Sequence, residues 1–474
     1  MTDRDTVRIP AETGCCSGGK HRAACGSAGG HLVRDCQKKR RNFMKKKVFV
    51  RVLRLCSFFC LTGLCCFTGP MGNAYAEQPV KIGFISALST PYGASNKATL
   101  DITIEEINKA GGILGRPVEL ITEDWKREVP LAVAAYKKLV LNDKCLLVFT
   151  EGTEGSTACA QVGSRLYSTQ PHLMFALWTS HDGFTDLVAD DYEKYKFIFR
   201  VYSNIADTYN PHLKYMEFFK NTIGTKKVAL LIEEAGFSEI PRKGKPGVYP
   251  TMKEYFEQNG MQVVYYTVTD GKEKMFLPIL EKAAASGADT ICFSMGYTDT
   301  VTLIKQWSQS AAKDMDIVLA SGAASSYASF WQMTGGRCLG VTEVAPEITI
   351  PFTKQTKPFL EKLKKAGFGF TGGIPGAYDS PWIVKEAIEK AGSTENMEKV
   401  IKNIEEGEFQ HGFWVWAFDG RHEPKKGYPY FPLLIGQFQE DGRYILVHPE
   451  NLAKITNPGD QYVRVKDLRK KAGL

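Results

Sequence analysis

The stretch "EEINKAGGILGRPVELITED", Glu105 to Asp124, joins the end of an amphipathic helix to a strand through a glycine-rich corner. Isoleucines at helical spacing lead up to Gly111 and Gly112, which allow the positive φ that ends a helix. Gly115 and Pro117 then turn the chain into an apolar strand. Exposed carbonyls at a helix C-terminus repel anions, whereas a phosphate loop needs a helix N-terminus. We therefore interpret these glycines as structural.

The same alternation of strand and helix extends along the chain on both sides of this corner. Near-continuous apolar strands separated by helices indicate a parallel sheet that is covered on both faces, and right-handed crossovers make it doubly wound. The pattern restarts near Tyr202, so we predict two α/β lobes. The predicted strands are VKIGFISAL, VELITED, CLLVFT and HLMFAL in the first lobe, and KKVALLIEE, MQVVYYTV, DTICFSM and DIVLAS in the second.

A third stretch, from about residue 322, adds helices and then two aromatic-rich runs that read as strands, FWVWAFD and YPYFPLLIGQF. It has too few strands for a sheet of its own, so we expect it to complete the first two lobes. The predicted first lobe comprises 77–202 plus 322–428, and the second comprises 203–321 plus 429–474. The chain would then cross between the lobes three times, which forms the hinge.

The N-terminal 76 residues differ in composition from the rest. They hold 14 of the 60 Lys and Arg residues but only 4 of the 52 Asp and Glu residues, which leaves 46 against 48 in the remainder. The net charge of +8 is therefore no argument for a nucleic-acid partner. Residues 44–76 have a Lys-rich start, a short apolar run and Ala74-Tyr75-Ala76, as in a cleavable signal peptide. We predict cleavage after Ala76 and an exported, periplasmic protein, with 1–43 a misassigned, disordered extension.

Cysteine and histidine give no sign of a metal or catalytic centre. Eight of the twelve cysteines precede residue 77, and no CxxC pattern occurs in the body. We expect the four body cysteines to be buried thiols. The six body histidines are scattered, and no HExxH, P-loop or GxSxG motif of the right context is present. We therefore expect no cofactor, no metal and no enzymatic activity, although a hydrolase remains the main rival class.

Several segments in this order resemble a known family. "INKAGGILGRPVELITED" is similar to the first lobe of periplasmic solute-binding proteins of the leucine/isoleucine/valine-binding type. "KIGFISALSTPYG", "FIFRVYSNIADTY", "AYDSPWIVKEAIEKAG" and "IGQFQEDGRYILVHPE" also match in order, so the resemblance covers essentially all of 77–474. It implies a two-lobed clamp that closes over a small solute and delivers it to a membrane ABC permease.

The loops that follow strands in the first lobe supply most candidate ligand contacts. Ser156 and Thr157 occupy the expected N-cap of a helix, and the resemblance assigns Ser156 to a ligand carboxylate. In the next loop it implies a backbone carbonyl, at Ala176, for an ammonium group and a hydroxyl, from Thr179 or Ser180, for the carboxylate. Capping alone is the competing interpretation of Ser156 and Thr157. The remaining candidates in or near this lobe are aromatic, Tyr92, Trp178, Tyr202 and Tyr378, and core or hinge packing is the alternative for each.

In the second lobe, the resemblance places Asp299 near the acid that pairs with the ammonium of an amino acid, and a helix cap is the equal alternative. Phe237 stands where the family often has a Tyr-Gly pair, which puts that tyrosine contact in doubt. We expect a monomer that binds a carboxylate-bearing solute, with an amino acid favoured. The alternatives are a binding protein for an aromatic acid or amide that feeds a separate receptor and, less favoured, an enzyme.

Overall fold

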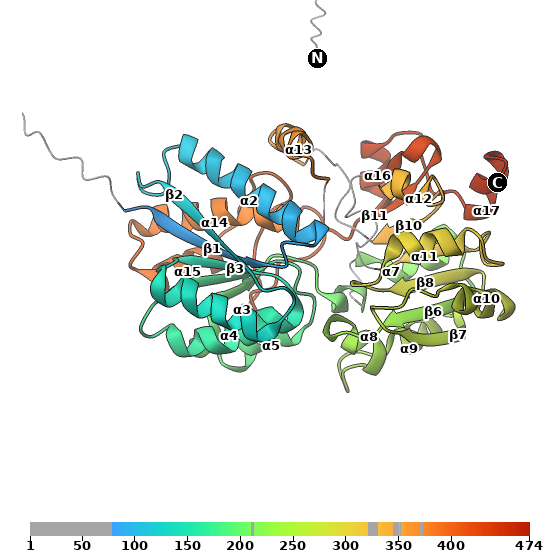
Figure 1. The fold of residues 1–474 in the computed structure, drawn as a ribbon, viewed down its shortest axis with the longest axis horizontal. Coiled ribbons are helices and arrows are strands. Elements are labelled where there is room, and N and C mark those ends of the chain that lie inside the picture. The colour runs from blue at the N-terminus through green and yellow to red at the C-terminus, as the bar shows by residue number, and fades with distance from the viewer. Residues whose placement is uncertain (1–77, 210–212, 321–329, 345–349, 351, 370–372) are drawn as a thin grey trace, which may run out of the picture. The chain divides into compact units, whose positions relative to one another are not determined.

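The computed structural model describes residues 78–209, 213–320, 330–344, 350, 352–369 and 373–474. The predicted N-terminal extension and signal peptide, 1–43 and 44–76, lie outside the described residues. From Ala76 to Leu474 the chain forms one compact unit. Within it, the elements gather into two lobes, each built on its own sheet (Figure 1).

The first sheet has five strands in the order β2-β1-β3-β4-β5, and all neighbours are parallel. From β1 the chain crosses to one side to form β2, then returns past β1 to form β3, β4 and β5. This reversal places successive helices on opposite faces, so the predicted doubly wound topology is confirmed. The strands are β1 (Val80–Ser86), β2 (Val118–Asp124), β3 (Leu147–Thr150), β4 (Leu173–Ala176) and β5 (Ile198–Arg200).

The second sheet has seven strands in the order β12-β11-β10-β9-β8-β6-β7. It reverses direction between β6 and β8, as the first sheet does between β1 and β3. Strand β11 runs antiparallel to both of its neighbours, β10 and β12, which corrects the expectation of a purely parallel sheet. The connection between β11 and β12 is too short for a parallel crossover. The strands are β6 (Lys227–Glu233), β7 (Gln262–Thr269), β8 (Thr290–Ser294), β9 (Asp316–Leu319), β10 (Thr342–Val344), β11 (Ile435–Phe438) and β12 (Tyr444–His448).

Helices connect the strands of each lobe. Those of the first lobe before the hinge are α2 (Pro91–Lys109), α3 (Val129–Lys137), α4 (Thr153–Leu166), α5 (Gly183–Asp190) and α6 (Tyr192–Tyr195). The second lobe contains α7 (Tyr215–Glu217), α8 (Glu239–Lys243), α9 (Met252–Gln258), α10 (Leu277–Ala285), α11 (Thr300–Trp307), α12 (Phe330–Thr334), α16 (Glu450–Thr456) and α17 (Val465–Lys471). The chain returns to the first lobe for α13 (Thr356–Lys365), α14 (Ile374–Ala391) and α15 (Met397–Glu405).

The three crossings of the chain follow from which lobe each element joins. The chain leaves the first lobe after β5, returns between β10 and α13, and leaves again before β11. The predicted return near 322 is therefore too early, because β10 pairs with β9 and Phe330 packs in the second core. The predicted strand FWVWAFD is also wrong. Its tryptophans, Trp414 and Trp416, pack in the first core, and Trp416 forms only an isolated bridge with Phe409.

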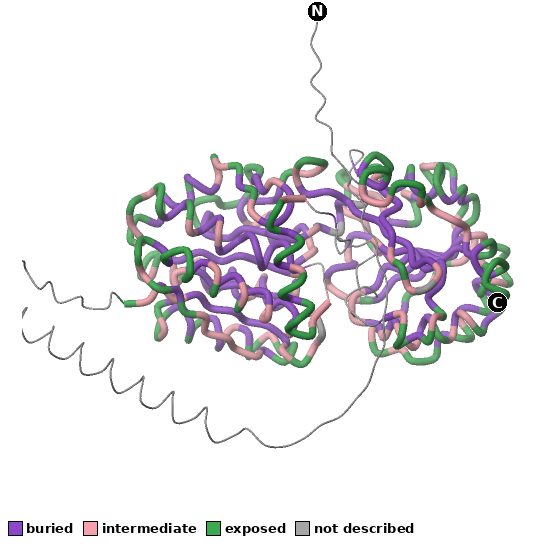
Figure 2. Tube along the Cα trace, turned by 90° about the horizontal axis from the view of Figure 1, so that it is seen from above, coloured by how far each residue is buried: buried purple, intermediate pink, exposed green. Residues whose placement is uncertain are grey.

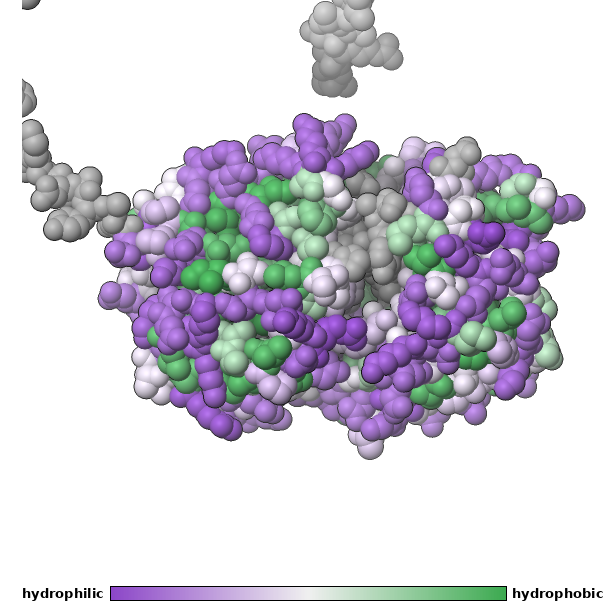
Figure 3. Space-filling view, in the orientation of Figure 1, coloured by the Kyte–Doolittle hydropathy of each residue, from purple (hydrophilic) through white to green (hydrophobic). Residues whose placement is uncertain are grey.

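Burial follows the strands of each lobe, and exposed residues lie mainly on the outer helices and turns (Figure 2). On the face shown in Figure 3, hydrophilic side chains predominate, with a hydrophobic group beside α2. Among the described residues, no helix is long and apolar enough to cross a membrane. The four body cysteines are buried thiols, as expected: Cys145, Cys159, Cys292 and Cys338.

The glycine corner after α2 has the structural role that its sequence predicts. Gly111 and Gly112 have φ values of 98° and 75°. Ile113 and Arg116 exchange backbone hydrogen bonds of 2.9 and 3.0 Å, which closes the turn. A Cβ on Gly112 would lie 1.9 Å from the carbonyl oxygen of Arg116, so only glycine fits. The corner faces the start of β2, whereas ligands of such sheets bind beyond the carboxyl ends of the strands.

Candidate functional site

Each sheet reverses its winding direction once, and the loops at these two points carry the candidate site. In the first lobe, Tyr92 follows β1 and Glu151 follows β3. In the second, Phe237 follows β6 and Tyr297 follows β8. In open α/β sheets such switch points open a crevice between neighbouring loops, which is where small ligands bind.

Three aromatic side chains of the first lobe pack in a row, which we call the aromatic wall: Tyr92, Trp178 and Tyr202. The ring centroids of Tyr92 and Trp178 lie 5.1 Å apart, and those of Trp178 and Tyr202 also lie 5.1 Å apart with an interplanar angle of 22°. The backbone of Trp178 has a φ of 29°, which is rare for a bulky residue and marks a strained loop. Burial, followed by the charge of Glu151, raises the pKa of Tyr92 to about 12.

The hydroxyls of Ser156 and Thr157 do not occupy the cap that the sequence suggested. Helix α4 begins at Thr153 with Gly152 as its N-cap, and the Ser156 N–H donates to the Gly152 carbonyl at 2.9 Å. The fully buried Ser156 hydroxyl donates to Thr150 at 2.9 Å, and Thr157 donates to the carbonyl of Thr153 at 2.8 Å. The N-cap prediction is therefore wrong, because the helix starts one turn earlier.

The other candidates of the β4 loop are also engaged within the protein. Ala176 is buried and its carbonyl accepts the Val201 N–H at 3.1 Å. Thr179 is fully buried, and its hydroxyl donates to the Ser156 oxygen at 2.8 Å. Ser180 is half-buried, and its N–H donates to the Thr153 hydroxyl at 3.4 Å. This loop thus presents Trp178 and Ser180 rather than a row of hydroxyls.

A buried acid that was not predicted from the sequence lies at the loops of the first lobe. Glu151 is 2% exposed and accepts hydrogen bonds from the Ser86 hydroxyl and, at 2.6 Å, from the Asn96 amide. Burial raises the pKa of Glu151 to about 7. The signal was available, since a glutamate directly after the buried run Leu147–Thr150 falls at the carboxyl edge of the sheet.

The second lobe has a matching glutamate, which supports a loop. Glu233 is 1% exposed and accepts the backbone N–H groups of Gly296, Tyr297 and Thr298 at 2.9 to 3.1 Å. The Thr298 hydroxyl donates to it at 2.7 Å. These bonds fix the loop that carries Tyr297, and the ring of Phe237 packs edge-on against Tyr297 with centroids 5.9 Å apart.

Asp299 has the geometry of a helix cap. Its carboxylate accepts the Thr302 N–H at 3.0 Å and the Thr302 hydroxyl at 2.8 Å at the start of α11, and Lys274 lies 3.2 Å away. Burial alone would raise the pKa of Asp299, but these hydrogen bonds outweigh it and lower the pKa. The capping alternative therefore accounts for Asp299, and the carboxylate already has a cationic partner.

Tyr378 does not lie with the other candidates. It belongs to the buried face of α14, and its ring packs on Phe359 with centroids 4.2 Å apart. Its hydroxyl donates to Glu106 of α2 at 2.7 Å. These contacts place it in the core of the first lobe, which corrects the cleft role that we considered from sequence.

Side chains of the two lobes meet next to the aromatic wall. The guanidinium of Arg127, which follows β2, lies 4.1 Å from the ring centroid of Tyr297 in the second lobe. The carboxylate of Glu154 accepts the N–H of Gly236 at 3.2 Å. Further along, Lys245 pairs with Asp186 at 2.7 Å. The loops at the two switch points therefore face one another.

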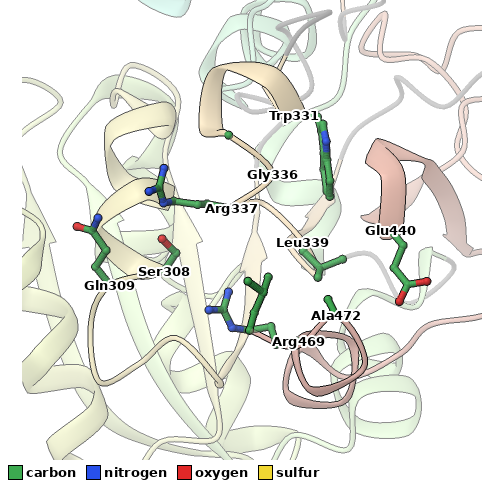
Figure 4. Close-up of a pocket in the computed structure, with 11 residues that line it drawn as sticks. Ser308, Gln309, Trp331, Gly336, Arg337, Leu339, Glu440, Arg469 and Ala472 are labelled. Carbon is green, nitrogen blue, oxygen red and sulfur yellow. The ribbon is translucent and has the colours of Figure 1, made fainter.

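A cavity of about 630 Å³ lies elsewhere in the second lobe (Figure 4). Arg337, Ser308 and Gln309 lie on one side of it, and Trp331 and Glu440 on the other. Ser308 follows the C-terminus of α11, at the sheet edge opposite the switch-point loops. Among the described residues, no group of three His, Cys, Asp or Glu side chains is arranged to hold a metal ion.

Comparisons with known proteins agree with this geometry. The periplasmic binding protein family matches residues 79–443. A Brucella melitensis protein described as Leu/Ile/Val-binding protein homolog 3 is 25% identical over 339 residues, which cover 70% of this chain and 84% of that protein.

Two solved structures share the fold at low sequence identity. A branched-chain amino acid transporter substrate-binding protein from Streptococcus pneumoniae, in complex with isoleucine, aligns with a TM-score of 0.63 and 18% identity, over 78% of this chain and 99% of that one. A solute-binding protein from R. palustris, in complex with 4-hydroxybenzoate, aligns with a TM-score of 0.62 and 18% identity, over 77% and 95%. This chain belongs to the periplasmic binding protein family, a family of binding proteins and not of enzymes.

Proposed function

We propose that the protein captures a small organic solute between its two lobes and delivers it to a membrane ABC permease. The observation that carries the proposal is the meeting of loops from both switch points beside the aromatic wall of Tyr92, Trp178 and Tyr202. A solute that contacts both lobes stabilises the arrangement in which they touch, by its differential contacts with that arrangement. The permease would bind this form in preference to the unliganded one.

The aromatic wall favours a solute with a flat or apolar part. Tyr and Trp rings bury large apolar areas and stack well on planar groups. The relatives named for leucine, isoleucine and valine make an amino acid one candidate, and the neighbour with 4-hydroxybenzoate makes a planar aromatic solute a second. The stacking of Trp178 on Tyr202 favours the planar solute.

Export and oligomeric state belong to the same proposal. A periplasmic protein that is released after Ala76 and acts as a monomer fits the family. The first lobe then comprises residues 77 to about 200 and about 352–431, and the second lobe comprises the remaining segments. A sensor that receives the liganded protein in place of a permease is the alternative partner.

The test is calorimetric titration of refolded, solute-free 77–474 with a panel of amino acids, aromatic acids, amides and amines. Refolding removes solute that is retained through purification. Saturable binding of one class with a stoichiometry near one supports solute capture. Turnover of a panel member without saturable binding would contradict it.

A further inference from the structure

Glu151 is a buried acid without a cationic partner. Among the described residues, no Lys, Arg or His side chain forms an ion pair with it, and its hydrogen-bond donors, Ser86 and Asn96, are both neutral. The buried Glu423 differs, because Arg200 lies 2.7 Å from it. An unpaired carboxylate out of water is costly unless it is neutralised or finds a cation. At a solute site, the solute can supply that cation.

One unpaired acceptor lies beside this carboxylate. Asn96 is fully buried, and its amide oxygen has no hydrogen-bond partner in the described part of the chain. Glu154, in the first turn of α4, carries a second carboxylate, which accepts the Gly236 N–H at 3.2 Å and the Tyr297 hydroxyl at 3.5 Å. The hydroxyls expected to hold a carboxylate, from Ser156 and Thr179, bond to each other instead. This side of the site therefore offers acceptors to a donor-rich group.

The placement of Arg127 and the aromatic wall are both compatible with a cationic solute. The guanidinium of Arg127 lies over the ring of Tyr297 at 4.1 Å, so Arg127 already has a partner in the second lobe. The faces of Tyr and Trp rings attract cations through their quadrupole. Tyr92, whose ring packs against Trp178, is raised in pKa first by burial and then by the charge of Glu151, so it lies near that carboxylate.

We propose that the solute presents a cationic nitrogen group, an amidinium or ammonium attached to a flat ring, to Glu151 and Asn96 beside the aromatic wall. This inference rests on the proposed solute capture and names the class of solute. It reverses the polarity expected from sequence, in which the first lobe would bind a carboxylate. A carboxylate placed there would meet Glu151 and Glu154 at close range.

The proposal also predicts how the affinity for the solute depends on pH. The charge of Glu151 acts on Tyr92, and Tyr92 in turn has Arg127 from the β2 loop and Glu154 from α4 as its other charged neighbours. Because burial raises the pKa of Glu151 to about 7, its charge is gained as the pH rises through that value. Affinity for a permanently charged cation should therefore increase from about pH 6 to about pH 8.

The experiment compares three solutes of nearly identical shape: benzamidinium, neutral benzamide and anionic benzoate. Each is titrated calorimetrically into refolded 77–474. We expect benzamidinium to bind at least about tenfold more tightly than benzamide and benzoate to bind least, since one charge-assisted contact is worth roughly that factor. Glu151→Gln should remove the preference for benzamidinium and its pH dependence.

The matched control is Asp379→Asn. Asp379 is also fully buried with its pKa raised to about 7 by burial, but it bonds to Gly412 and Trp416 in the core of the first lobe. This variant should keep the wild-type preference. Loss of the preference in both variants would attribute the effect to folding and overturn the assignment to Glu151.

A second measurement does not depend on the chosen ring or on any variant. Protein purified without refolding is denatured, and the released small molecules are identified by mass spectrometry. An organic cation supports the proposal. An acid without a basic nitrogen, or tighter binding of benzoate than of benzamidinium, overturns it and leaves solute capture standing. Absence of any released or titrated solute contradicts the proposed function itself, and the inference with it.

Discussion

Arg200 fixes the loop that carries Trp178, and replacing it by methionine tests how that loop is held. Arg200 is fully buried at the end of β5, and its Nε lies 2.7 Å from the carboxylate of Glu423. Its guanidinium also donates to the carbonyl of Thr179 and, at 2.6 Å, to that of His181. One side chain thus joins the site loop to the segment just before the last crossing between the lobes.

The expected loss follows from what remains after the substitution. Arg200→Met leaves Glu423, which is 3% exposed, with Lys426 at 3.9 Å, the Thr185 hydroxyl and the Asn204 amide at 3.4 Å. Breaking a buried ion pair by removing one partner typically costs about 3–5 kcal/mol. Because Lys426 compensates part of the charge, we expect about 3 kcal/mol in the free energy of unfolding.

Urea unfolding followed by tryptophan fluorescence and circular dichroism measures this loss. The matched control is Lys97→Met, which removes an exposed pair with Asp101 and should change the free energy of unfolding by no more than about 0.5 kcal/mol. A loss below about 1 kcal/mol for Arg200→Met, or equal losses for both variants, would refute the role given to the buried pair. Solute affinity should also fall, because the Trp178 loop loses two of its anchors.

Four further outcomes are expected. Gly112→Ala should lower the free energy of unfolding, measured by urea titration, by more than about 2 kcal/mol, because its Cβ would lie 1.9 Å from a carbonyl oxygen. Gly111→Ala, whose Cβ would have no atom within 4 Å, should lower it by only about 1 kcal/mol. Equal losses would contradict the clash. Burial lowers the pKa of His172 to about 4, so stability falls as the pH drops from about 6.5 toward 4, by about 2 kcal/mol at pH 5. His172→Asn should remove that part of the pH dependence, and an unchanged slope would refute the shift. Trp178→Ala should weaken solute binding at least about tenfold by calorimetry, with Trp178→Phe intermediate, and unchanged affinity would exclude the wall from the site. Arg127→Ala should weaken it by about two- to fivefold, since it removes a cation–π contact between the lobes, while the exposed neighbour Lys126 can be replaced without effect.

Much of the fold could be predicted because local sequence signals and topology agree. The apolar strands, the glycine corner at Gly111 and Gly112, and the restart near Tyr202 each correspond to an observed element. The boundary near 322 was misplaced because β10 is only three residues long and carries little signal. The run FWVWAFD has the composition of a strand, yet its tryptophans pack into the first core without a partner strand.

The site was harder to predict than the fold. Tyr92, Trp178 and Tyr202 were named from sequence, but their stacking depends on loops that meet only in three dimensions. Ser156 and Asp299 each had two interpretations for a common reason: a polar residue near a helix start can cap the helix or bind a ligand. Asp299 caps α11, whereas the Ser156 hydroxyl bonds to Thr150 and does neither, and only geometry separates these roles. The place of Glu151 at the carboxyl edge of the sheet follows from the strand before it, but its burial and its lack of a cation are invisible in the sequence.

The central claim is that a solute draws the two lobes together at the loops of Tyr92 and Tyr297. Since the four body cysteines are buried, single labels can be introduced at exposed Lys137 of the first lobe and Lys253 of the second. The distance between the labels is then measured by electron spin resonance in the refolded 77–474 fragment, with and without the solute released from native protein. The account predicts a shorter and narrower distance distribution at saturation. An unchanged distribution under conditions in which calorimetry shows saturable binding would contradict it.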